Sequence, residues 1–402
     1  MALIRHSQTL ARVARSAPSL ARSLATPSAN SKPPTAIVLM NMGGPSTIPE
    51  VGPFLSRLFH DHDLIPLPFQ KYMAPWIAKR RTPQIEKQYE AIGGGSPIRR
   101  WTAVQGEMMV ALLDELSPST APHKAYTAFR YADPLTEECL AELKRDGVKR
   151  AVAFTQYPQY SCSTTGSSLN ELWRGLKEAG KKEAGGEVGI EWSVIDRWPT
   201  QPKLVEAIAE SITKTLESYE PAVRDNVVIL FSAHSLPLSV VNRGDPYITE
   251  VAATVLAVME HLGNKNPYRL SWQSKVGPSA WQGPQTIDAL KGLHRNGQND
   301  VVMVPVAFTS DHIETLFELD QEYGQEMKEL GMNITRSPSL NDSPTFARAL
   351  ADLASQHLAD VSSGRHGPIS PQLALRCPGC TNDRCKGSKE FFAKRGLETV
   401  QA

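Results

Sequence analysis

Residues 301–318 read Val-Val-Met-Val-Pro-Val-Ala-Phe-Thr-Ser-Asp-His-Ile-Glu-Thr-Leu-Phe-Glu, and this stretch is the most informative part of the chain. Its first seven residues are apolar and predict a buried strand, which is typical of a parallel sheet covered by helices on both faces. We expect a helix to begin near Asp311 and to carry Asp311, Glu314 and Glu318 as one acidic stripe, because they are spaced by three and four residues. With His312 beside it, such a stripe at the carboxyl end of a strand can bind a cation or transfer protons.

A simpler interpretation of these residues is a capping box, in which Asp311 is the N-cap and Glu314 lies three residues further on. A second stretch favours a site instead. Residues 227–237 read Val-Val-Ile-Leu-Phe-Ser-Ala-His-Ser-Leu-Pro, so another apolar strand ends in a loop, which here carries His234. A single histidine usually packs or caps. Two strand ends with titratable groups point to a ligand site, because open α/β sheets bind ligands at the carboxyl ends of their strands.

Apolar strands alternate with amphipathic helices along the rest of the chain. Further strands are predicted at 36–40 and 151–155, and helices at 103–116, 135–146, 201–218 and 247–262. This alternation favours parallel sheets with helices on both faces. The segment 152–155 (Val-Ala-Phe-Thr) is repeated at 306–309, and the strand that ends at Asn41-Met42 resembles the one that ends at Ala233-His234. We therefore expect two similar α/β domains that face each other across a cleft.

The first 32 residues differ in composition from the rest of the chain. They are rich in Arg, Ser and Ala, and the first acidic residue of the chain is Glu50. This composition predicts a mitochondrial transit peptide, and a disordered basic tail is the alternative. After this leader (residues 1–32) we expect one domain at 33–200, a second at 201–345, and a C-terminal extension at 346–402.

The overall composition excludes several classes of protein. The chain has 402 residues, 41% of them hydrophobic, which suits a folded protein of about two domains. No stretch approaches 18 uninterrupted apolar residues, so we expect no transmembrane helix. The net charge of +1 provides no basic footprint for nucleic acid. The glycine-rich turn at 93–97 lacks the Lys-Ser/Thr ending of a P-loop, so we expect no nucleotide site.

Residues 53–81 combine apolar and basic side chains in an unusual way. Aromatic and large aliphatic residues are interleaved with prolines, and Lys79-Arg80-Arg81 ends the segment. Apolar side chains beside basic ones suit a surface that dips into a membrane interface. They equally suit the lip of a pocket for a flat, apolar ligand that bears carboxylates. A buried irregular loop is the third possibility.

Three of the five cysteines form a C-x2-C-x4-C cluster, at Cys377, Cys380 and Cys385. Three close thiols predict a metal site in a reducing compartment, where structural disulfides are rare. A tetrahedral site needs a fourth ligand. Cys162 lies in a polar turn beyond a strand end and suits that place, whereas Cys139 lies in a helical stretch and is expected to pack. The spacing does not choose between zinc and an iron–sulfur cluster.

Together these motifs resemble the ferrochelatase family. The resemblance runs from Ala36 to Phe392 and is strongest in five segments: 41–45 (Asn-Met-Gly-Gly-Pro), 93–98 (Gly-Gly-Gly-Ser-Pro-Ile), 156–160 (Gln-Tyr-Pro-Gln-Tyr), 232–237 (Ser-Ala-His-Ser-Leu-Pro) and 308–316 (Phe-Thr-Ser-Asp-His-Ile-Glu-Thr-Leu). It implies two Rossmann-like (chelatase-type) domains around a cleft. It also implies an enzyme that inserts Fe(II) into protoporphyrin IX, with release of two protons, in the last step of haem synthesis. With the leader and the cysteine tail, it implies the mitochondrial form, a homodimer on the matrix face of the inner membrane that carries a [2Fe-2S] cluster.

The resemblance also implies roles for single residues. It makes His234 the base at the porphyrin nitrogens and Glu314 its partner across the cleft. The residues that it places on an acidic path for protons or iron are Asp311, His312 and Glu318. Those that it places around the porphyrin are Met42, Arg80, Arg81, Tyr89, Ser96, Tyr157 and Trp281, and those that it assigns to the cluster are Cys162, Cys377, Cys380 and Cys385. A chelatase for another divalent metal and a non-catalytic tetrapyrrole-binding protein are the alternatives.

Overall fold

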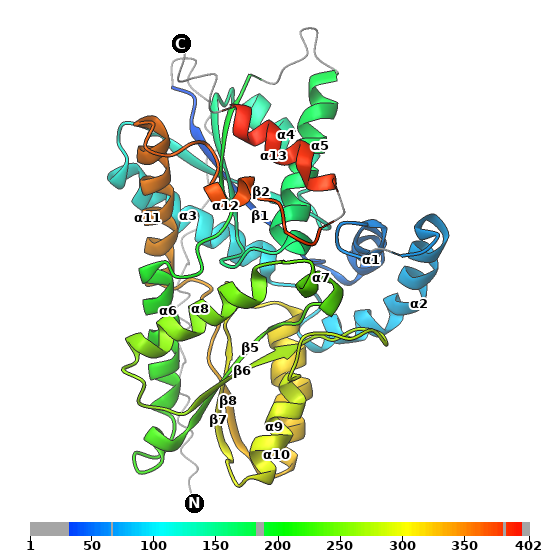
Figure 1. Cartoon of the computed structure of the whole chain (residues 1–402), viewed down its shortest axis with the longest axis vertical. Helices are drawn as coiled ribbons and strands as arrows, with labels where there is room; N and C mark the ends of the chain where they lie inside the picture. Colours follow the sequence, from blue (N-terminus) through cyan, green and yellow to red (C-terminus); the bar gives the residue numbers. More distant parts are fainter. Residues whose placement is uncertain (1–31, 66, 182–188, 381–382, 396–402) are drawn as a thin grey trace, which may run out of the picture. The chain divides into compact units, whose positions relative to one another are not determined.

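Four strands of the N-terminal half form a parallel sheet in the computed structural model (Figure 1). In the sheet order β2-β1-β3-β4, they are β2 (His123–Phe129), β1 (Thr35–Asn41), β3 (Arg150–Thr155) and β4 (Glu191–Ile195). All seven residues of β1 are buried. A central parallel strand needs apolar residues on both faces, because helices cover each side of the sheet.

Four strands of the C-terminal half form a second parallel sheet. In the order β6-β5-β7-β8, they are β6 (Tyr268–Gln273), β5 (Val228–His234), β7 (Asp300–Pro305) and β8 (Asn333–Arg336). The α/β fold with two parallel sheets is therefore confirmed. The two sheets correspond strand for strand, so Asn41 and His234 end equivalent strands. The Val-Ala-Phe-Thr repeat is out of register, since 152–155 lies within β3 whereas 306–309 follows β7.

The predicted helices are all present, with small differences at their ends. They are α3 (Ile98–Leu116), α4 (Thr136–Arg145), α6 (Pro202–Leu216) and α8 (Tyr247–His261). Further helices are α5 (Ser167–Lys181), α7 (Leu238–Asn242), α9 (Thr286–Arg295), α10 (Gly324–Glu329) and α11 (Pro344–Ser362), with 3-10 turns at Ile48–Glu50 and Arg224–Asn226. Two segments are π-helical, η2 (Cys162–Gly166) and η4 (Glu314–Tyr323).

One hydrophobic core is shared by both sheets. It contains Leu39 and Phe154 from the first sheet and Phe231 from the second, together with side chains of α3, α6, α8 and α11. Helix α11 packs against both α3 and α6, so the packed body continues beyond residue 345. Because this core is continuous, the chain from Pro33 onwards forms one unit. The predicted domain boundary at residue 200 stays a prediction.

The cysteine-bearing tail is part of the folded body. It contains α12 (Pro371–Ala374) and α13 (Arg384–Arg395), and α13 packs on α5 and β4. Phe392 is fully buried and meets the ring of Trp192 edge to face, with 6.4 Å between the ring centroids. Burying one such side chain contributes about 1.5–3 kcal/mol. Gly387 lies against Trp173, where a Cβ atom would be 2.5 Å from the ring, so only glycine fits there.

Residues 53–81 are mostly helical, so the interpretation of this segment as a buried irregular loop is wrong. The segment falls on α1 (Val51–His60) and α2 (Gln70–Ala91). The structure describes residues 32–65, 67–181, 189–380 and 383–395. The predicted transit peptide therefore lies outside the described residues, apart from Lys32. No helix in the described ranges is long and apolar enough to cross a membrane.

Candidate functional site

The last residue of β5 faces the first residue of η4. Nδ1 of His234 lies 2.8 Å from Oε2 of Glu314, so the two strand ends singled out in the sequence meet in space. The side chain of His234 lies deep in the protein, yet 39% of its surface is accessible. A ligand can therefore reach the imidazole.

The capping-box interpretation of Asp311 and Glu314 is wrong. The carboxylate of Glu314 pairs with His234, and the backbone N–H of Asp311 donates to Oδ1 of Asn341 at 2.8 Å. The helix begins at Glu314 and is of the π type, so Asp311 lies before it. π-Helical turns are rare and occur frequently at functional sites.

The charged forms of the pair, the Glu314 carboxylate and the His234 imidazolium, stabilise each other. Burial favours the neutral form of Glu314, but the positive charge of His234, then that of His312 and the hydroxyl of Ser274, outweigh burial and lower the pKa of Glu314 to about 2. Burial also disfavours the imidazolium form of His234. The charge and hydrogen bond of Glu314 outweigh it and raise the pKa of His234 above its ordinary value. The site therefore holds a carboxylate beside an imidazole of increased basicity.

Glu318, one turn further along η4, is held by donors from β6 and its loop. Its carboxylate accepts from the backbone N–H of Ser274 at 2.7 Å, from Nε2 of Gln273 at 3.1 Å and from the hydroxyl of Tyr323 at 2.6 Å. Gln273 and Ser274 were not among the predicted residues, because no strand was predicted at 268–273. This segment reads Tyr-Arg-Leu-Ser-Trp-Gln and lacks the continuous apolar run of the predicted strands. Ser274 has a φ of +64°, a strained value for a residue other than glycine.

Asp311 is paired with scaffold residues. It lies 3.1 Å from Nη1 of Arg336, and it also accepts from Asn341 at 2.8 Å and from the hydroxyl of Thr315 at 3.0 Å. Burial raises the pKa of Asp311, but Arg336 and the hydrogen bonds outweigh burial and lower it. His312 lies closer to the pair of His234 and Glu314, with Nε2 3.9 Å from Oε1 of Glu314.

Several predicted porphyrin contacts gather near the end of β1. Met42 directly follows the strand, and the phenol of Tyr157 lies close to the Met42 backbone. Ser96 is buried against Gly44, where a Cβ atom would lie 2.7 Å from the Ser96 side chain. Tyr89, on α2, is buried, and burial followed by the nearby charge of Glu314 raises its pKa well above the ordinary value. Tyr89 therefore lies near both this group and the pair of His234 and Glu314.

Other predicted contacts lie further out. Trp281 pairs with Pro237 in an isolated β-bridge, so it flanks the loop that follows His234. Arg80 is exposed on α2 and covers the ring of Trp76 at 5.5 Å. Arg81 is half-buried on the same helix. The structure thus places Arg80 on the surface of α2, beside aromatic residues.

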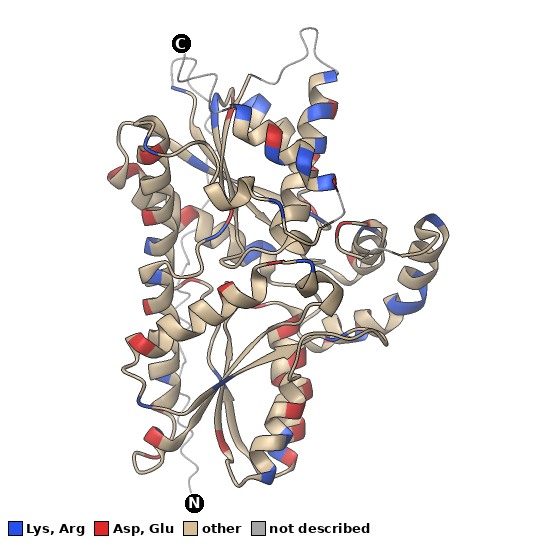
Figure 2. Ribbon diagram, in the orientation of Figure 1, with Lys and Arg blue, Asp and Glu red and all other residues tan. Residues whose placement is uncertain are grey.

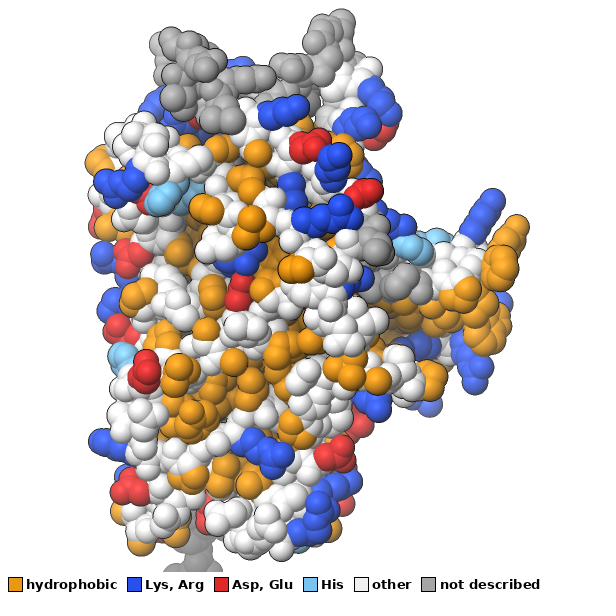
Figure 3. Space-filling model, in the orientation of Figure 1, with side chains coloured by type: hydrophobic (Ala, Val, Ile, Leu, Met, Phe, Trp, Pro, Cys, Tyr) orange, Lys and Arg blue, Asp and Glu red, His pale blue; other side chains and the backbone are white. Residues whose placement is uncertain are grey.

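The start of α2 presents aromatic side chains to solvent. Phe69 is 83% exposed, Tyr72 73% and Trp76 55%. Figure 3 shows hydrophobic side chains beside Lys and Arg on α2, at the right of the view. We call this surface of Phe69, Tyr72 and Trp76 the lip. By contrast, Phe59 is buried against α2, so only part of the predicted apolar segment forms a surface.

Three of the four predicted cluster cysteines lie near one buried phenol, that of Tyr160. Burial, and then the nearby Cys385, Cys162, Asp245 and Cys377, raise the pKa of Tyr160 well above its ordinary value. Cys380 follows Cys377 in a turn in which its N–H donates to the Cys377 carbonyl at 3.0 Å. This turn lies on the same surface as Cys162, as the contacts of Arg243 show.

Arg243 joins the tail to the turn that carries Cys162. Its Nη2 atom lies 2.8 Å from Sγ of Cys162, and its carbonyl accepts from the N–H of Gly379 at 2.9 Å. Burial followed by the charge of Asp245 raises the pKa of Cys162 to about 12. Cys139 lies on α4 and is buried among apolar side chains. Across the described residues, no three Cys, His, Asp or Glu side chains already form a metal-binding group.

The chain is similar to known proteins over most of its length. The Ferrochelatase family model matches residues 34–358. The mitochondrial ferrochelatase of Bos taurus is 58% identical over 370 residues, which cover 92% of this chain and 86% of that protein. That of Homo sapiens is 56% identical over 368 residues (91% and 85%), and that of Schizosaccharomyces pombe 52% identical over 370 residues (91% and 85%). The chain belongs to the ferrochelatase family, the metal chelatases that insert iron into protoporphyrin in haem synthesis.

Proposed function

We propose that His234 is the general base of iron insertion. The chain is an enzyme, a lyase that inserts ferrous iron into protoporphyrin IX. Two protons must leave the porphyrin nitrogens as the metal enters, and a base within hydrogen-bond reach of these nitrogens lowers the barrier. The observation that carries the assignment is the accessible imidazole of His234, held by a carboxylate on its other side.

The hydrogen bond to Glu314 decides which nitrogen of His234 acts. With a pKa of about 2, Glu314 is ionised and only accepts hydrogen bonds. Nδ1 of neutral His234 must then carry the proton, which leaves a lone pair on Nε2. Nε2 takes a proton from a pyrrole N–H, and Glu314 stabilises the imidazolium that results, as the aspartate of a catalytic triad does.

Further carboxylates continue from the pair along η4. Glu318 and Glu322 follow Glu314 at intervals of four residues, and Figure 2 shows several Asp and Glu positions, in red, along the helix that ends in α10. Burial, followed by the charge of Glu318, raises the pKa of Glu322. A carboxyl group that is more easily protonated suits exchange with solvent. The proposed route for departing protons or arriving iron therefore runs from Glu314 through Glu318 to Glu322, and a part for Asp311 and His312 stays a prediction.

The proposed porphyrin site lies between the ends of β1 and β5. Met42 would face one side of the ring and His234 the other, since they follow or end equivalent strands. Ser96, Tyr89, Tyr157 and Trp281 would line the site, and Arg80 and Arg81 would reach the propionates. A planar ring hides both its N–H groups and its lone pairs, so contacts on both faces that pucker the ring lower the barrier.

A [2Fe-2S] cluster is the cofactor that suits the cysteines. Four thiols are the usual ligand set of such a cluster. Cys162, Cys377 and Cys385 lie near Tyr160, and Arg243 joins Cys162 to the turn that holds Cys377 and Cys380. The raised pKa of Cys162, Cys377 and Cys385 means that these thiols are neutral without a metal. Bound iron supplies the positive charge that makes them thiolates.

The chain is mitochondrial, as its relatives are, and we place it on the matrix face of the inner membrane. The exposed aromatic residues of the lip and the basic residues that follow them support a monotopic attachment. A homodimer is supported by the resemblance and by an apolar surface. Figure 3 shows hydrophobic side chains gathered over α8, where Leu256 is exposed. Such a patch is typical of a contact between subunits.

One experiment tests the central assignment. Fe(II) is added anaerobically to enzyme and protoporphyrin, and insertion is followed as loss of porphyrin fluorescence. His234→Ala should lose on the order of a hundred- to ten-thousand-fold in turnover, the range for loss of a general base. The variant should still bind porphyrin as the wild type does, because it keeps the fold. Wild-type turnover of the variant would contradict the role of His234, and wild-type protein that accepts Co(II) but not Fe(II) would indicate a different chelatase.

A further inference from the structure

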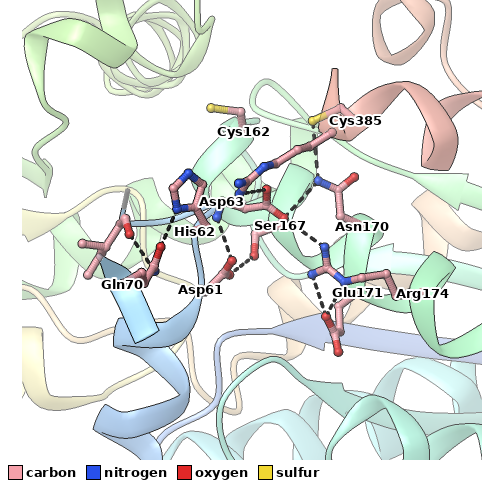
Figure 4. Close-up of polar contacts among 12 residues, drawn as sticks. Asp61, His62, Asp63, Gln70, Cys162, Ser167, Asn170, Glu171, Arg174 and Cys385 are labelled. Atoms are coloured by element: carbon pink, nitrogen blue, oxygen red, sulfur yellow. Dashed lines mark hydrogen bonds and ion pairs between the residues drawn. The ribbon is translucent and has the colours of Figure 1, made fainter. Parts of the chain in front are cut away.

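A buried amide links Cys385 to the turn that precedes the lip. This amide belongs to Asn170 on α5, which is 1% exposed. Its Nδ2 atom lies 3.6 Å from Sγ of Cys385 and 3.2 Å from Oδ2 of Asp63 (Figure 4). Because a carboxylate only accepts hydrogen bonds, the atom that faces Asp63 is the NH2 group. Its two hydrogens serve two acceptors, the sulfur of Cys385 and the carboxylate of Asp63.

Asp63 also collects cations from two helices. Its side chain is 6% exposed, and Arg174 of α5 and Arg384 of α13 lie 3.4 Å and 3.3 Å from its oxygens. Arg384 directly precedes Cys385, so the first turn of α13 supplies both a cysteine thiol and a cation for Asp63. Any shift of the first turn of α13 would therefore affect Asp63 through two contacts, one by way of Asn170 and one with Arg384.

The turn at residues 61–63 has a second anchor that does not involve the tail. Asp61 is buried and accepts hydrogen bonds from the hydroxyl groups of Tyr131 and Ser167, both at 2.6 Å, and it lies 3.1 Å from Nη2 of Arg130. Burial raises the pKa of Asp61, but Arg130 and the hydroxyl donors outweigh burial and lower it. Asp61 thus holds residues 61–63 to the segment that follows β2 and to the start of α5, while Asp63 holds them to the cysteine-bearing helix α13.

From this turn the contacts continue to the first residue of α2. His62, between the two aspartates, hydrogen-bonds through Nδ1 to the side chain of Gln70 (Figure 4). Nε2 of Gln70 donates to the carbonyls of Phe59 at 2.9 Å and Ile65 at 3.0 Å. Gln70 therefore closes the loop between α1 and α2, and α2 carries the lip.

We propose that Asn170 and Asp63 couple the cysteine site to the lip. With Cys385 held in the [2Fe-2S] cluster proposed above, on which this inference rests, Asn170 and Arg384 hold Asp63 and the start of α2 is ordered. With Cys385 released, both contacts loosen and the start of α2 becomes mobile. The N–H···S hydrogen bond of Asn170 also makes reduction of a cluster at this site easier, because hydrogen bonds to the ligand sulfurs raise its reduction potential.

Hydrogen–deuterium exchange of the intact protein tests the coupling. Peptides that cover residues 61–78 are compared in protein purified with its cluster and in protein from which iron has been removed with a chelator. Exchange in these peptides should become faster by roughly tenfold or more after removal, since local opening controls exchange. Peptides from β5 and β7 should not change. Unchanged exchange at 61–78 would overturn the proposal.

Two variants separate the links of the path. Asn170→Ala should retain visible absorption, exchange quickly at 61–78 even with iron bound, and have a lower cluster reduction potential. Asp63→Asn should exchange as quickly but should not have a lower potential, because Asn170 still reaches Cys385 and the change removes a negative charge near that sulfur. Lys177→Gln is the control, an exposed residue of the same helix that should change neither quantity.

The outcomes distinguish this inference from the proposed cluster. If Asn170→Ala fails to assemble iron, Asp63→Asn still tests the path to the lip. Iron-loaded Asn170→Ala with wild-type exchange and wild-type potential would refute the coupling alone. Colourless wild-type protein with full turnover would refute the cluster, and the coupling with it.

Discussion

His234 and Glu314 form a hydrogen bond of 2.8 Å although 80 residues separate them in the chain. One ends β5 and the other begins η4, which follows β7, the neighbour of β5 in the second sheet. The carboxyl ends of neighbouring parallel strands meet at one edge of a sheet, so the fold brings the imidazole and the carboxylate together.

Glu314→Gln should reduce turnover strongly while leaving the protein folded. Glutamine keeps the size of the side chain but removes the negative charge that stabilises the imidazolium of His234. Anaerobic iron insertion and a thermal melt, measured on the same preparation, check this prediction. A variant with a lowered melting temperature and full turnover would mean that Glu314 is structural.

The acid limb of the pH profile should depend on Glu314. His234 acts as a base only when neutral, and its pKa is raised above the ordinary value of 6.5. Turnover should therefore increase with pH through this raised pKa. In Glu314→Gln the charge that raises the pKa is gone, so the remaining activity should have its acid limb at lower pH. A limb that does not move between the two proteins would show that another group titrates.

The same pair should affect stability in a defined pH window. The pKa of Glu314 is lowered, so its contribution to the free energy of unfolding is present above its unfolded value near 4.5 and is lost as pH falls toward 2. The pKa of His234 is raised, so its contribution is present below its unfolded value near 6.5 and is lost as pH rises through the folded value. Urea unfolding of wild type and Glu314→Gln should therefore differ most between about pH 4.5 and 6.5.

Asp311→Asn should lower the stability of the protein more than it lowers turnover. Arg336, which lies 3.1 Å from Asp311, keeps its second partner Asp320 at 2.7 Å, so the loss should be about 1.5–3 kcal/mol. Urea unfolding measures this loss, and turnover measured well below the melting temperature should change little. Full stability with severely reduced turnover would instead place Asp311 on the proton or iron path.

The four clustered cysteines should be required for colour, and the fifth should not. Replacing Cys162, Cys377, Cys380 or Cys385 by Ser should abolish the visible charge-transfer bands of an iron–sulfur cluster. Cys139→Ala should keep them, and alanine is the better control because Cys139 is buried among apolar side chains. Absorption spectra and iron content provide the measurement. Stoichiometric zinc in active, colourless protein would identify a zinc site.

Removing the aromatic side chains of the lip should weaken membrane binding. The triple change of Phe69, Tyr72 and Trp76 to Ser removes exposed groups that are each worth up to about 1.5–3 kcal/mol when buried. Sedimentation with vesicles of inner-membrane lipids should show at least roughly tenfold weaker binding. Leu330→Ser, an exposed leucine elsewhere, is the control. Equal binding of all three proteins would show that the lip does not contact lipid.

The leader should be removed on import. N-terminal sequencing of protein purified from mitochondria should give a start between about residues 25 and 36, as expected for an acid-free, arginine-rich presequence. An intact Met1 in that preparation would contradict the transit-peptide prediction.

The fold class and the candidate residues could be predicted from the sequence alone. Continuous apolar runs can only be buried on both faces, and they alternate with helical periodicity, so parallel sheets with helices on both faces follow from local pattern. The strands at 36–40, 151–155, 227–231 and 301–307 are these runs; the first two lie within β1 and β3, and the other two overlap β5 and β7. Shorter or more polar edge strands such as β6 and β8 have no comparable signal, so Gln273 and Ser274 were missed.

Which candidate residues contact one another depends on the tertiary structure. Spacing could not show that Glu314 bonds to His234 while Asp311 pairs with Arg336, because both partners are distant in sequence and are set by strand order. It also could not show that Asn170 lies between Cys385 and Asp63. Such contacts arise when separate elements pack into one body, and no local periodicity records them.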